Sequence, residues 1–315
     1  MPKVTLFEKR DDCWTIWEHL NRKTHNGVCG LDLLRDHGVE YSDVNSGDIE
    51  VAMYGNACNP RSSINYILEA PVVSPDPYAG IYHEKSFLGR FTALEPNPDY
   101  VTKICGEYIK NTYKSQVCAI FDYKTDWENK DKFMVIFTSV QDFEGPFKNA
   151  YSLGGVKRRT IVKAAERYGD RFDFYGKKDD GCPNYRGRMF DGRRWDYPKM
   201  DCVAGYKFSI CLENSMFDGY VTEKIAHSLN TRTIPIYYGA PNIKDYVPKE
   251  LFIDMQDFET IDQCFDFVDS LSEQKIKNMI EDIDSFVKDD QATSKISSFR
   301  LANDFVNCLK GCGAI

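Results

Sequence analysis

Short runs of apolar residues without polar alternation recur through the second half of the chain. Such runs are typical of strands in a parallel sheet that is covered on both faces. Five of them are separated by polar segments or by segments with helical spacing, and they span residues 133–137, 172–175, 206–212, 234–238 and 251–253. The pattern therefore predicts an α/β fold class here, with a parallel sheet whose strands alternate with helices.

Helical spacing appears between these runs and after them. Ile161, Val162, Ala165 and Tyr168 mark one side of a helix, and Gly169 follows as its stop signal. Three further helices are predicted near the C-terminus, from the apolar positions within 261–268, 276–283 and 301–308.

The first half of the chain is less regular. Apolar runs at 4–7, 49–53 and 64–68 predict strands, and turn-rich stretches separate them. The chain has 315 residues, of which 42% are hydrophobic. That length is roughly twice the usual size of a domain, so each half can bury a core of its own. We therefore expect two α/β domains.

Composition narrows the class of protein. The formal net charge is −8, which argues against a protein that covers nucleic-acid backbones or anionic membranes. The apolar runs have about five residues, far fewer than the roughly 18 that cross a bilayer, so no membrane span is expected. The N-terminus has no signal-peptide pattern and the 11 cysteines are scattered. Both features favour a soluble protein of the reduced cytoplasm.

One stretch of the second half combines a buried strand, a polar loop and the start of a helix. Residues 206–215 read Tyr-Lys-Phe-Ser-Ile-Cys-Leu-Glu-Asn-Ser, and the helix that follows has Thr222, Glu223 and Lys224 in its first turn. Ligands of a doubly wound sheet bind beyond the carboxyl ends of its strands. The segments just after residues 137, 212 and 238 are therefore the expected places for the chemistry.

The first turn of this helix has the features of an anion site. Free main-chain N–H groups and the side chain of Lys224 suit a pyrophosphate. A carboxylate such as that of Glu223 suits the hydroxyl groups of a ribose. The same residues also describe an ordinary capped helix whose Glu223 and Lys224 lie in water, and the sequence pattern alone leaves both interpretations open.

The earlier helix offers a second cation. Arg158 lies on the same side of it as Ile161 and Val162, whereas Arg159 and Lys163 lie on other sides. We therefore expect Arg158 to point inward, where its fork of N–H groups can meet an anion in two-pronged fashion. The alternative is that Arg158 pairs with a buried acid.

Three segments carry a resemblance to a known family. Residues 206–215, then Gly-Tyr-Val-Thr-Glu-Lys-Ile at 219–225, then Ile-Pro-Ile-Tyr-Tyr-Gly-Ala-Pro at 234–241 resemble the donor-binding signature of the α1,3/4-fucosyltransferases, glycosyltransferase family ten. The resemblance implies a GT-B-like fold, in which two Rossmann-like domains face each other across a cleft. Residues 1–148 would bind the acceptor, and residues 149–300 would bind the donor GDP-fucose. A C-terminal helix at 301–315 would follow, and whether it packs back on the first domain stays open.

The resemblance also assigns roles to residues at matching positions. Arg158 and Lys224 would hold the diphosphate, Glu223 would hold the ribose, and Asn214 and Tyr220 would complete the donor site.

A further segment of the first half extends the resemblance. Residues 67–75, Ile-Leu-Glu-Ala-Pro-Val-Val-Ser-Pro, are similar to the Glu-Ser-Pro segment whose glutamate is the general base of the family. That glutamate maps to Glu69, although Ala70 departs from the serine of the pattern.

The implied activity is an inverting transfer of fucose from GDP-fucose to a hydroxyl group of an oligosaccharide or glycan acceptor. Glu69 would take the proton, while Arg158 and Lys224 would stabilise the leaving diphosphate. Because such cations can replace a metal, we expect no metal site and no required cofactor, with a divalent cation at most stimulating the reaction. Two alternatives stay open: a transferase of the same fold that uses another nucleotide sugar, and a catalytically silent protein that binds nucleotides or carbohydrates.

Overall fold

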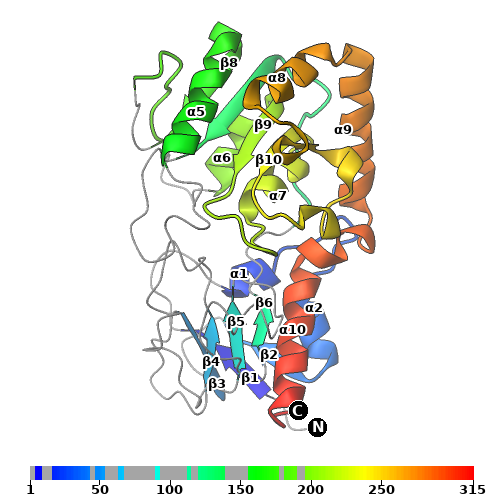
Figure 1. Ribbon diagram of the computed structural model, residues 1–315. Helices are drawn as coiled ribbons and strands as arrows, with labels where there is room; N and C mark the ends of the chain where they lie inside the picture. The colour runs from blue at the N-terminus through cyan, green and yellow to red at the C-terminus, as the bar shows by residue number, and fades with distance from the viewer. Residues whose placement is uncertain are drawn as a thin grey trace.

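The computed structural model describes residues 4–8, 16–42, 47–53, 63–66, 89–92, 112–114, 120–138, 155–176, 181–189 and 196–315. Within these ranges the chain forms two separate β-sheets, and every strand pair in both of them is parallel (Figure 1). The expected α/β class with two sheets is therefore confirmed.

The first sheet comes from the N-terminal part of the described chain. Its strands lie in the order β2-β1-β3-β4-β5-β6. Their bounds are β1 (Val4–Phe7), β2 (Val39–Tyr41), β3 (Ile49–Met53), β4 (Ser63–Tyr66), β5 (Gly89–Thr92) and β6 (Thr112–Lys114). Two short helices, α1 (Ile16–Leu20) and α2 (Gly30–Asp36), precede β2. The strands at 4–7 and 49–53 match their predicted bounds. Strands β2, β5 and β6 were not predicted, because their three or four residues include polar ones and form no apolar run.

The second sheet has the strand order β11-β10-β9-β7-β8. Its strands are β7 (Lys132–Phe137), β8 (Phe172–Tyr175), β9 (Tyr206–Leu212), β10 (Ile234–Tyr238) and β11 (Ile253–Asp254). The apolar runs predicted all five. The last prediction is shifted, because residues Lys249–Leu251 form a 3₁₀ turn, η5, and the strand begins only at Ile253.

Strand β7 shows where the chain passes from the first sheet to the second. It lies on the N-terminal side of the expected boundary at 148/149, yet it pairs with β8 on one side and with β9 on the other. Its run Lys132–Phe137 is mostly apolar, and the side chains of its three middle positions are buried. A run of this kind needs a strand on each side and helices above and below. Divided by sheets, the chain therefore changes from one part to the other between β6 and β7, earlier than residue 148.

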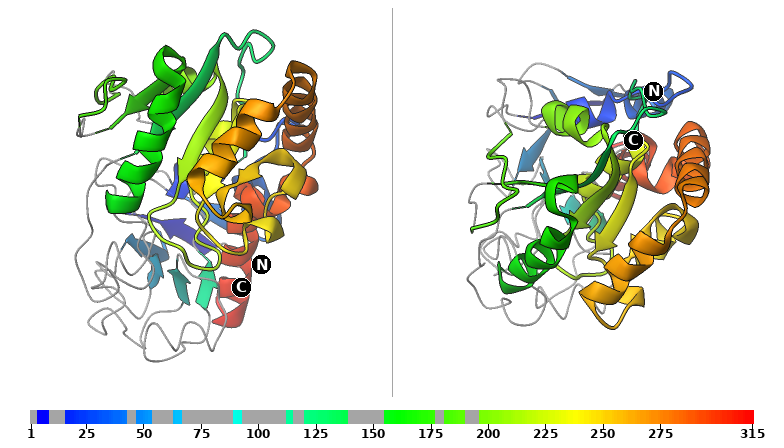
Figure 2. Two further views of the ribbon diagram at one scale, coloured as in Figure 1. Left: turned by 45° about the horizontal axis from the view of Figure 1, so that its top comes forward. Right: turned by 90° about the horizontal axis from the view of Figure 1, so that it is seen from above.

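Helices cover both faces of the second sheet (Figure 2). They are α5 (Gly155–Ala165), α6 (Asp196–Val203), α7 (Glu223–Asn230), α8 (Ile261–Ser270) and α9 (Glu273–Lys288). Helix α5 packs against α8, and α7 packs against both α6 and α9. The chain leaves α5 through the 3₁₀ turn η3 (Glu166–Arg171), in which Gly169 has φ of 54°. This left-handed conformation is one that glycine adopts at no steric cost. The predicted helix thus ends in two steps, with α5 ending at Ala165 and the 3₁₀ turn continuing past Gly169.

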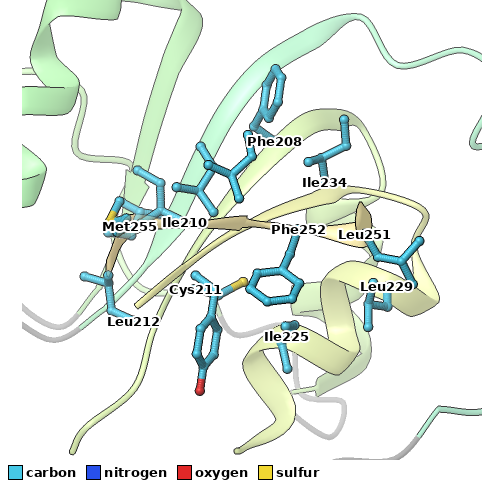
Figure 3. Packing of buried hydrophobic residues seen from close by; sticks show 14 of the residues in the cluster. Phe208, Ile210, Cys211, Leu212, Ile225, Leu229, Ile234, Leu251, Phe252 and Met255 are labelled. Carbon is cyan, nitrogen blue, oxygen red and sulfur yellow. The ribbon is translucent and has the colours of Figure 1, made fainter. Parts of the chain in front are cut away.

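The core of the second sheet shows why its strands lack polar alternation. Phe208, Ile210 and Leu212 lie on one face of β9, and Cys211 lies on the other face, toward α7 (Figure 3). Helix α7 packs Ile225 and Leu229 against this second face, and both side chains are fully buried. Because both faces are covered, every position of β9 except Lys207 is buried.

The last helix, α10 (Ser298–Gly311), follows the 3₁₀ turn η7 (Ala292–Ile296) and leaves the second part of the chain. It packs along α2 and also contacts α1 and β6 (Figure 1). Its buried residues Leu301, Phe305 and Leu309 belong to the same apolar cluster as Leu6 and Leu34. The C-terminal segment thus returns to the first sheet. No helix of the described ranges combines the length and the apolar character that a membrane crossing requires.

Candidate functional site

Three strands of the second sheet end side by side, and polar residues follow each of them. Thr138 follows β7, Glu213 and Asn214 follow β9, and Gly239 follows β10. The strands are adjacent and parallel, so their carboxyl ends lie at the same edge. The main-chain N–H of Glu213 also donates to the carbonyl oxygen of Tyr238 at 3.0 Å. The predicted location of the chemistry, just after residues 137, 212 and 238, is therefore one continuous region.

Arg158 reaches into this region from the first turns of α5. Its side chain is 3% exposed, while Arg159 and Lys163 on the same helix are exposed, so the expected inward orientation is confirmed. Nη1 donates to the hydroxyl oxygen of Thr138 at 2.8 Å. Nη2 donates to the main-chain oxygen of Glu213 at 3.0 Å and to Oδ1 of Asn214 at 2.7 Å. The guanidinium group is thus fixed across the ends of two strands.

Burial lowers the pKa of Arg158, and the nearby Tyr220 and Glu213 raise it. An arginine stays protonated even so, which means that this region holds a positive charge largely shielded from water. Tyr220 itself is 3% exposed, and its main-chain N–H donates to the carbonyl oxygen of Phe217 at 3.1 Å.

Glu213 lies at the centre of the site, although no sequence pattern assigned it a role. Its side chain is fully buried. Oε1 accepts a hydrogen bond from the main-chain N–H of Thr222 at 2.8 Å, and Oε2 accepts one from the hydroxyl group of Thr222 at 2.7 Å. Oε2 also accepts from Nζ of Lys224 at 3.3 Å. All three contacts come from donor groups.

Gly239 leaves room for this carboxylate side chain. A Cβ atom at residue 239 would lie 2.4 Å from Cγ of Glu213, closer than any van der Waals contact. A side chain at this position would therefore displace Glu213. This close packing explains why the segment 234–241 has a glycine at residue 239.

Lys224 and Glu223 occupy the first turn of α7, as predicted. Nζ of Lys224 donates to the hydroxyl oxygen of Thr222 at 2.9 Å and lies 3.5 Å from Oε1 of Glu223. The side chains of Lys224 and Glu223 are 14% and 15% exposed. The alternative of an ordinary helix with both charges in water is therefore wrong. Both groups are held against the carboxyl ends of the strands.

The two cations and the two carboxylates form one network. Arg158 contacts the main-chain oxygen of Glu213 and Lys224 contacts its carboxylate, so a single residue joins the positive groups of two helices. Burial raises the pKa of Glu213, and the Lys224 charge lowers it. For Glu223, burial also raises the pKa, but the charges of Lys224 and Lys199 lower it by more than burial raises it. The resulting pKa is about 2. Glu223 is therefore ionised at neutral pH.

Sequence reasoning missed Glu213 and Lys199. Glu213 stands in the quoted segment 206–215 directly after the buried run, and that place at a strand end was the available signal. Lys199 belongs to α6, a helix of eight residues that no pattern predicted. Its approach to the site depends on how α6 packs against α7.

Some predicted residues and properties are not reached by the structure. Glu69 and the whole segment 67–75 lie outside the described residues, so the role of Glu69 stays a prediction. Among the residues that the structure does describe, no group of three or more His, Cys, Asp or Glu side chains is placed to hold a metal ion. The structure brings together all five residues expected to bind the sugar-nucleotide donor: Arg158, Asn214, Tyr220, Glu223 and Lys224.

Comparison with known families points to the same region. Residues 149–279 match the family model described as glycosyltransferase family 10 (fucosyltransferase), C-terminal part. Over 78 residues, or 24% of this chain, the sequence is 41% identical to an α-(1,3)-fucosyltransferase of Helicobacter pylori. Over 84 residues, or 26% of this chain, it is 33% identical to an α-(1,4)-fucosyltransferase of Arabidopsis thaliana. The matched segments span 16% and 21% of the length of these two relatives.

The fold extends further than these local matches. The crystal structure of an α1,3-fucosyltransferase with GDP-fucose superimposes with a TM-score of 0.56 at 17% identity, covering 98% of this chain and 91% of that one. At this identity the likeness concerns the fold alone. It confirms the expected GT-B-like fold with two Rossmann-like α/β parts.

Proposed function

We propose that the protein transfers fucose from GDP-fucose to a hydroxyl group of an acceptor glycan, because residues 149–279 match the model of glycosyltransferase family 10. One observation carries the proposal. Arg158 from α5 and Lys224 from α7 converge on the fully buried Glu213 at the carboxyl edge of the second sheet. Two inward cations beside helix N-termini are what a nucleoside diphosphate needs.

The diphosphate of the donor would lie between these two helices. The N-terminal N–H groups and the positive dipole ends of both helices would favour a phosphate placed there. Arg158 offers a fork of donors and Lys224 a compact charge. When the bond to the sugar breaks, negative charge grows on the diphosphate, and these fixed cations would stabilise it without any reorganisation.

Three further residues would orient the rest of the donor. Glu223 is ionised and only 15% exposed, so it can accept hydrogen bonds from the two hydroxyl groups of a ribose. Asn214 already accepts from Arg158, and its amide N–H₂ group adds donors beside the diphosphate. Tyr220 lies near Arg158 and closes the same side of the site.

The transfer itself would be a single displacement with inversion. The acceptor oxygen attacks the anomeric carbon of fucose, the bond from that carbon to the β-phosphate oxygen breaks, and GDP leaves with the bonding electrons. Glu69 takes the proton of the attacking hydroxyl group, a role worth typically 10²- to 10⁴-fold in rate. We propose that the first part of the chain presents both Glu69 and the acceptor, and that the reaction needs no metal ion.

The donor is tested first by thermal unfolding with GDP, UDP and dTDP. We expect the melting temperature to rise with GDP and to stay unchanged with the other two, because a ligand that binds the folded state stabilises it. Transfer is then measured on a glycan array with GDP-fucose, in buffer with and without EDTA. A rise in melting temperature with UDP alone would show that the donor is a UDP-sugar and not GDP-fucose. Binding of GDP without transfer to any glycan would favour a silent binding protein.

The role of Glu69 is tested by Glu69→Gln, with Glu259→Gln as the control because Glu259 is exposed on the second part. We expect Glu69→Gln to lower kcat by at least 10²-fold while the Kd for GDP stays within twofold. The control should leave both unchanged. Transfer by Glu69→Gln at the wild-type rate would remove Glu69 from the role of base.

A further inference from the structure

Lys199 approaches the donor site from a helix that no pattern in the sequence predicted. It lies in the middle of α6, and its Nζ is 3.9 Å from Oε1 of Glu223. The side chains of the two residues are 12% and 15% exposed. Nζ also lies 5.6 Å from the ring centroid of Phe137, the last residue of β7. The lysine therefore reaches across the end of the second sheet to the first turn of α7.

The charges around α7 alternate in sign. Lys199 lies 3.9 Å from Glu223, Glu223 lies 3.5 Å from Lys224, and Lys224 lies 3.3 Å from Glu213. Both lysine distances from Glu223 are measured to the same atom, Oε1. The carboxylate of Glu223 is thus shared by two ammonium groups that belong to different helices.

This sharing has a consequence for Lys224. An ammonium group paired closely with a carboxylate interacts less strongly with a phosphate, because part of its charge is already compensated. Without the Lys199 charge, Lys224 would be the remaining lysine beside Glu223. The attraction between Lys224 and Glu223 would then draw these two side chains together. Glu223 would then turn toward Lys224, and both groups would leave the positions in which they can meet a ligand.

We propose that Lys199 is a positioning residue of the nucleotide site: it shares the Glu223 carboxylate with Lys224 and holds that carboxylate toward the ribose of a nucleoside diphosphate. The inference rests on the proposed function, because it takes the donor to be a nucleotide. Lys199 touches the carboxylate and acts through it, so its effect appears in the recognition of the ribose.

Electrostatics agrees with this geometry. Burial lowers the pKa of Lys199, and the Glu223 carboxylate raises it. In turn Lys224 and Lys199 offset the burial that would raise the pKa of Glu223. Each charge therefore offsets part of the burial penalty of the other.

The test compares GDP with 2′,3′-dideoxy-GDP, which lacks the ribose hydroxyl groups. Dissociation constants of both are measured by titration calorimetry for the wild type, Lys199→Met, Lys199→Arg and Lys207→Met. Lys207 is the matched control because it also pairs with a glutamate, Glu273, at 2.8 Å, but at the start of β9 and away from the site. Far-UV circular dichroism and the melting temperature check that each variant is folded.

In the wild type and in Lys207→Met, we expect loss of the two hydroxyl groups to weaken binding at least tenfold, since hydrogen bonds to a charged group are strong. In Lys199→Met, this penalty should fall below about threefold, because Glu223 no longer faces the ribose. Lys199→Arg keeps the charge and should keep most of the penalty. In a Glu223→Gln background, Lys199→Met should change the penalty no further.

Each failure has a different meaning. A full tenfold penalty in folded Lys199→Met would overturn the inference while leaving the nucleotide site intact. A wild type that binds GDP and dideoxy-GDP equally would overturn both the inference and the ribose role of Glu223. A wild type that binds no guanine nucleotide would refute the proposed function itself. If Lys199→Met does not fold, the same affinities are measured with Lys199→Gln. Loss of the penalty in folded Lys199→Gln would support the inference, and a retained penalty would overturn it.

Discussion

Replacing Glu213 by glutamine should destabilise the protein far more than the same change at the surface. The amide keeps an oxygen for the main-chain N–H of Thr222, which donates to Oε1 at 2.8 Å. It replaces Oε2 by an N–H₂ group, and Oε2 is the atom that accepts from the Thr222 hydroxyl group at 2.7 Å and from Nζ of Lys224 at 3.3 Å. Two donors, Lys224 and the new amide, would then face each other in a buried place.

The expected cost follows from these contacts. A hydrogen bond to a charged group contributes about 1.5–3 kcal/mol. The Thr222 hydroxyl group can reverse and accept from the new amide, so the contact with Lys224 is the one that is lost. Burial raises the pKa of Glu213, so removal of the charge also relieves a desolvation cost and offsets part of the loss. We expect a net decrease of about 2 kcal/mol in the free energy of unfolding.

Urea unfolding followed by tryptophan fluorescence measures this decrease. With a slope of about 3 kcal/mol/M, the midpoint should fall by about 0.7 M at unchanged slope. Glu273→Gln is the matched control, because Glu273 is 81% exposed and pairs with Lys207 at 2.8 Å. Exposed ion pairs contribute at most about 1 kcal/mol, so the control should shift by less than about 0.3 M. Equal shifts in the two variants would refute the argument that Glu213 anchors the site.

Two further predictions concern the charges around Glu213. Arg158→Lys should weaken GDP binding at least tenfold by calorimetry, because an ammonium group cannot span the Thr138, Glu213 and Asn214 oxygens that the guanidinium fork contacts; the exposed neighbour Arg159→Lys should bind as the wild type does, and equal affinities would contradict the assignment. Glu223 has a folded pKa of about 2 against 4.5, so its contribution to stability is present above pH 4.5 and is lost as the pH falls toward 2. Urea midpoints from pH 5 to pH 2.5 should therefore decline less in Glu223→Gln than in the wild type, and parallel declines would exclude a depressed pKa.

The pattern of apolar residues was enough to predict the second sheet. The runs at 206–212 and 234–238 coincide with β9 and β10, because a strand buried on both faces has a sequence unlike that of any surface element. The inward side of Arg158 also followed from the sequence, since a helix fixes which residues share a side. The same reasoning did not predict β2, β5 and β6, because their sequences Val-Glu-Tyr, Gly-Arg-Phe-Thr and Thr-Tyr-Lys contain no apolar run.

The division of the chain and the composition of the site depended on contacts between distant residues. Strand β7 joins the second sheet because it pairs between β8 and β9, and pairing partners are not visible in the residues of a single strand. Arg158 and Glu213 are 55 positions apart in the sequence. They meet because β7 and β9 are neighbours in a parallel sheet and their ends lie level.

From the sequence alone came the strands of the second sheet, the helix that carries Glu223 and Lys224 in its first turn, and the types of charge on this helix. The tertiary structure decided which of these charges are buried and what each one contacts. It placed Glu213 between Arg158 and Lys224, and it brought Lys199 from α6 to Glu223. The physical reason is that local patterns fix the direction of a side chain relative to its own element, whereas its partners depend on how separate elements pack.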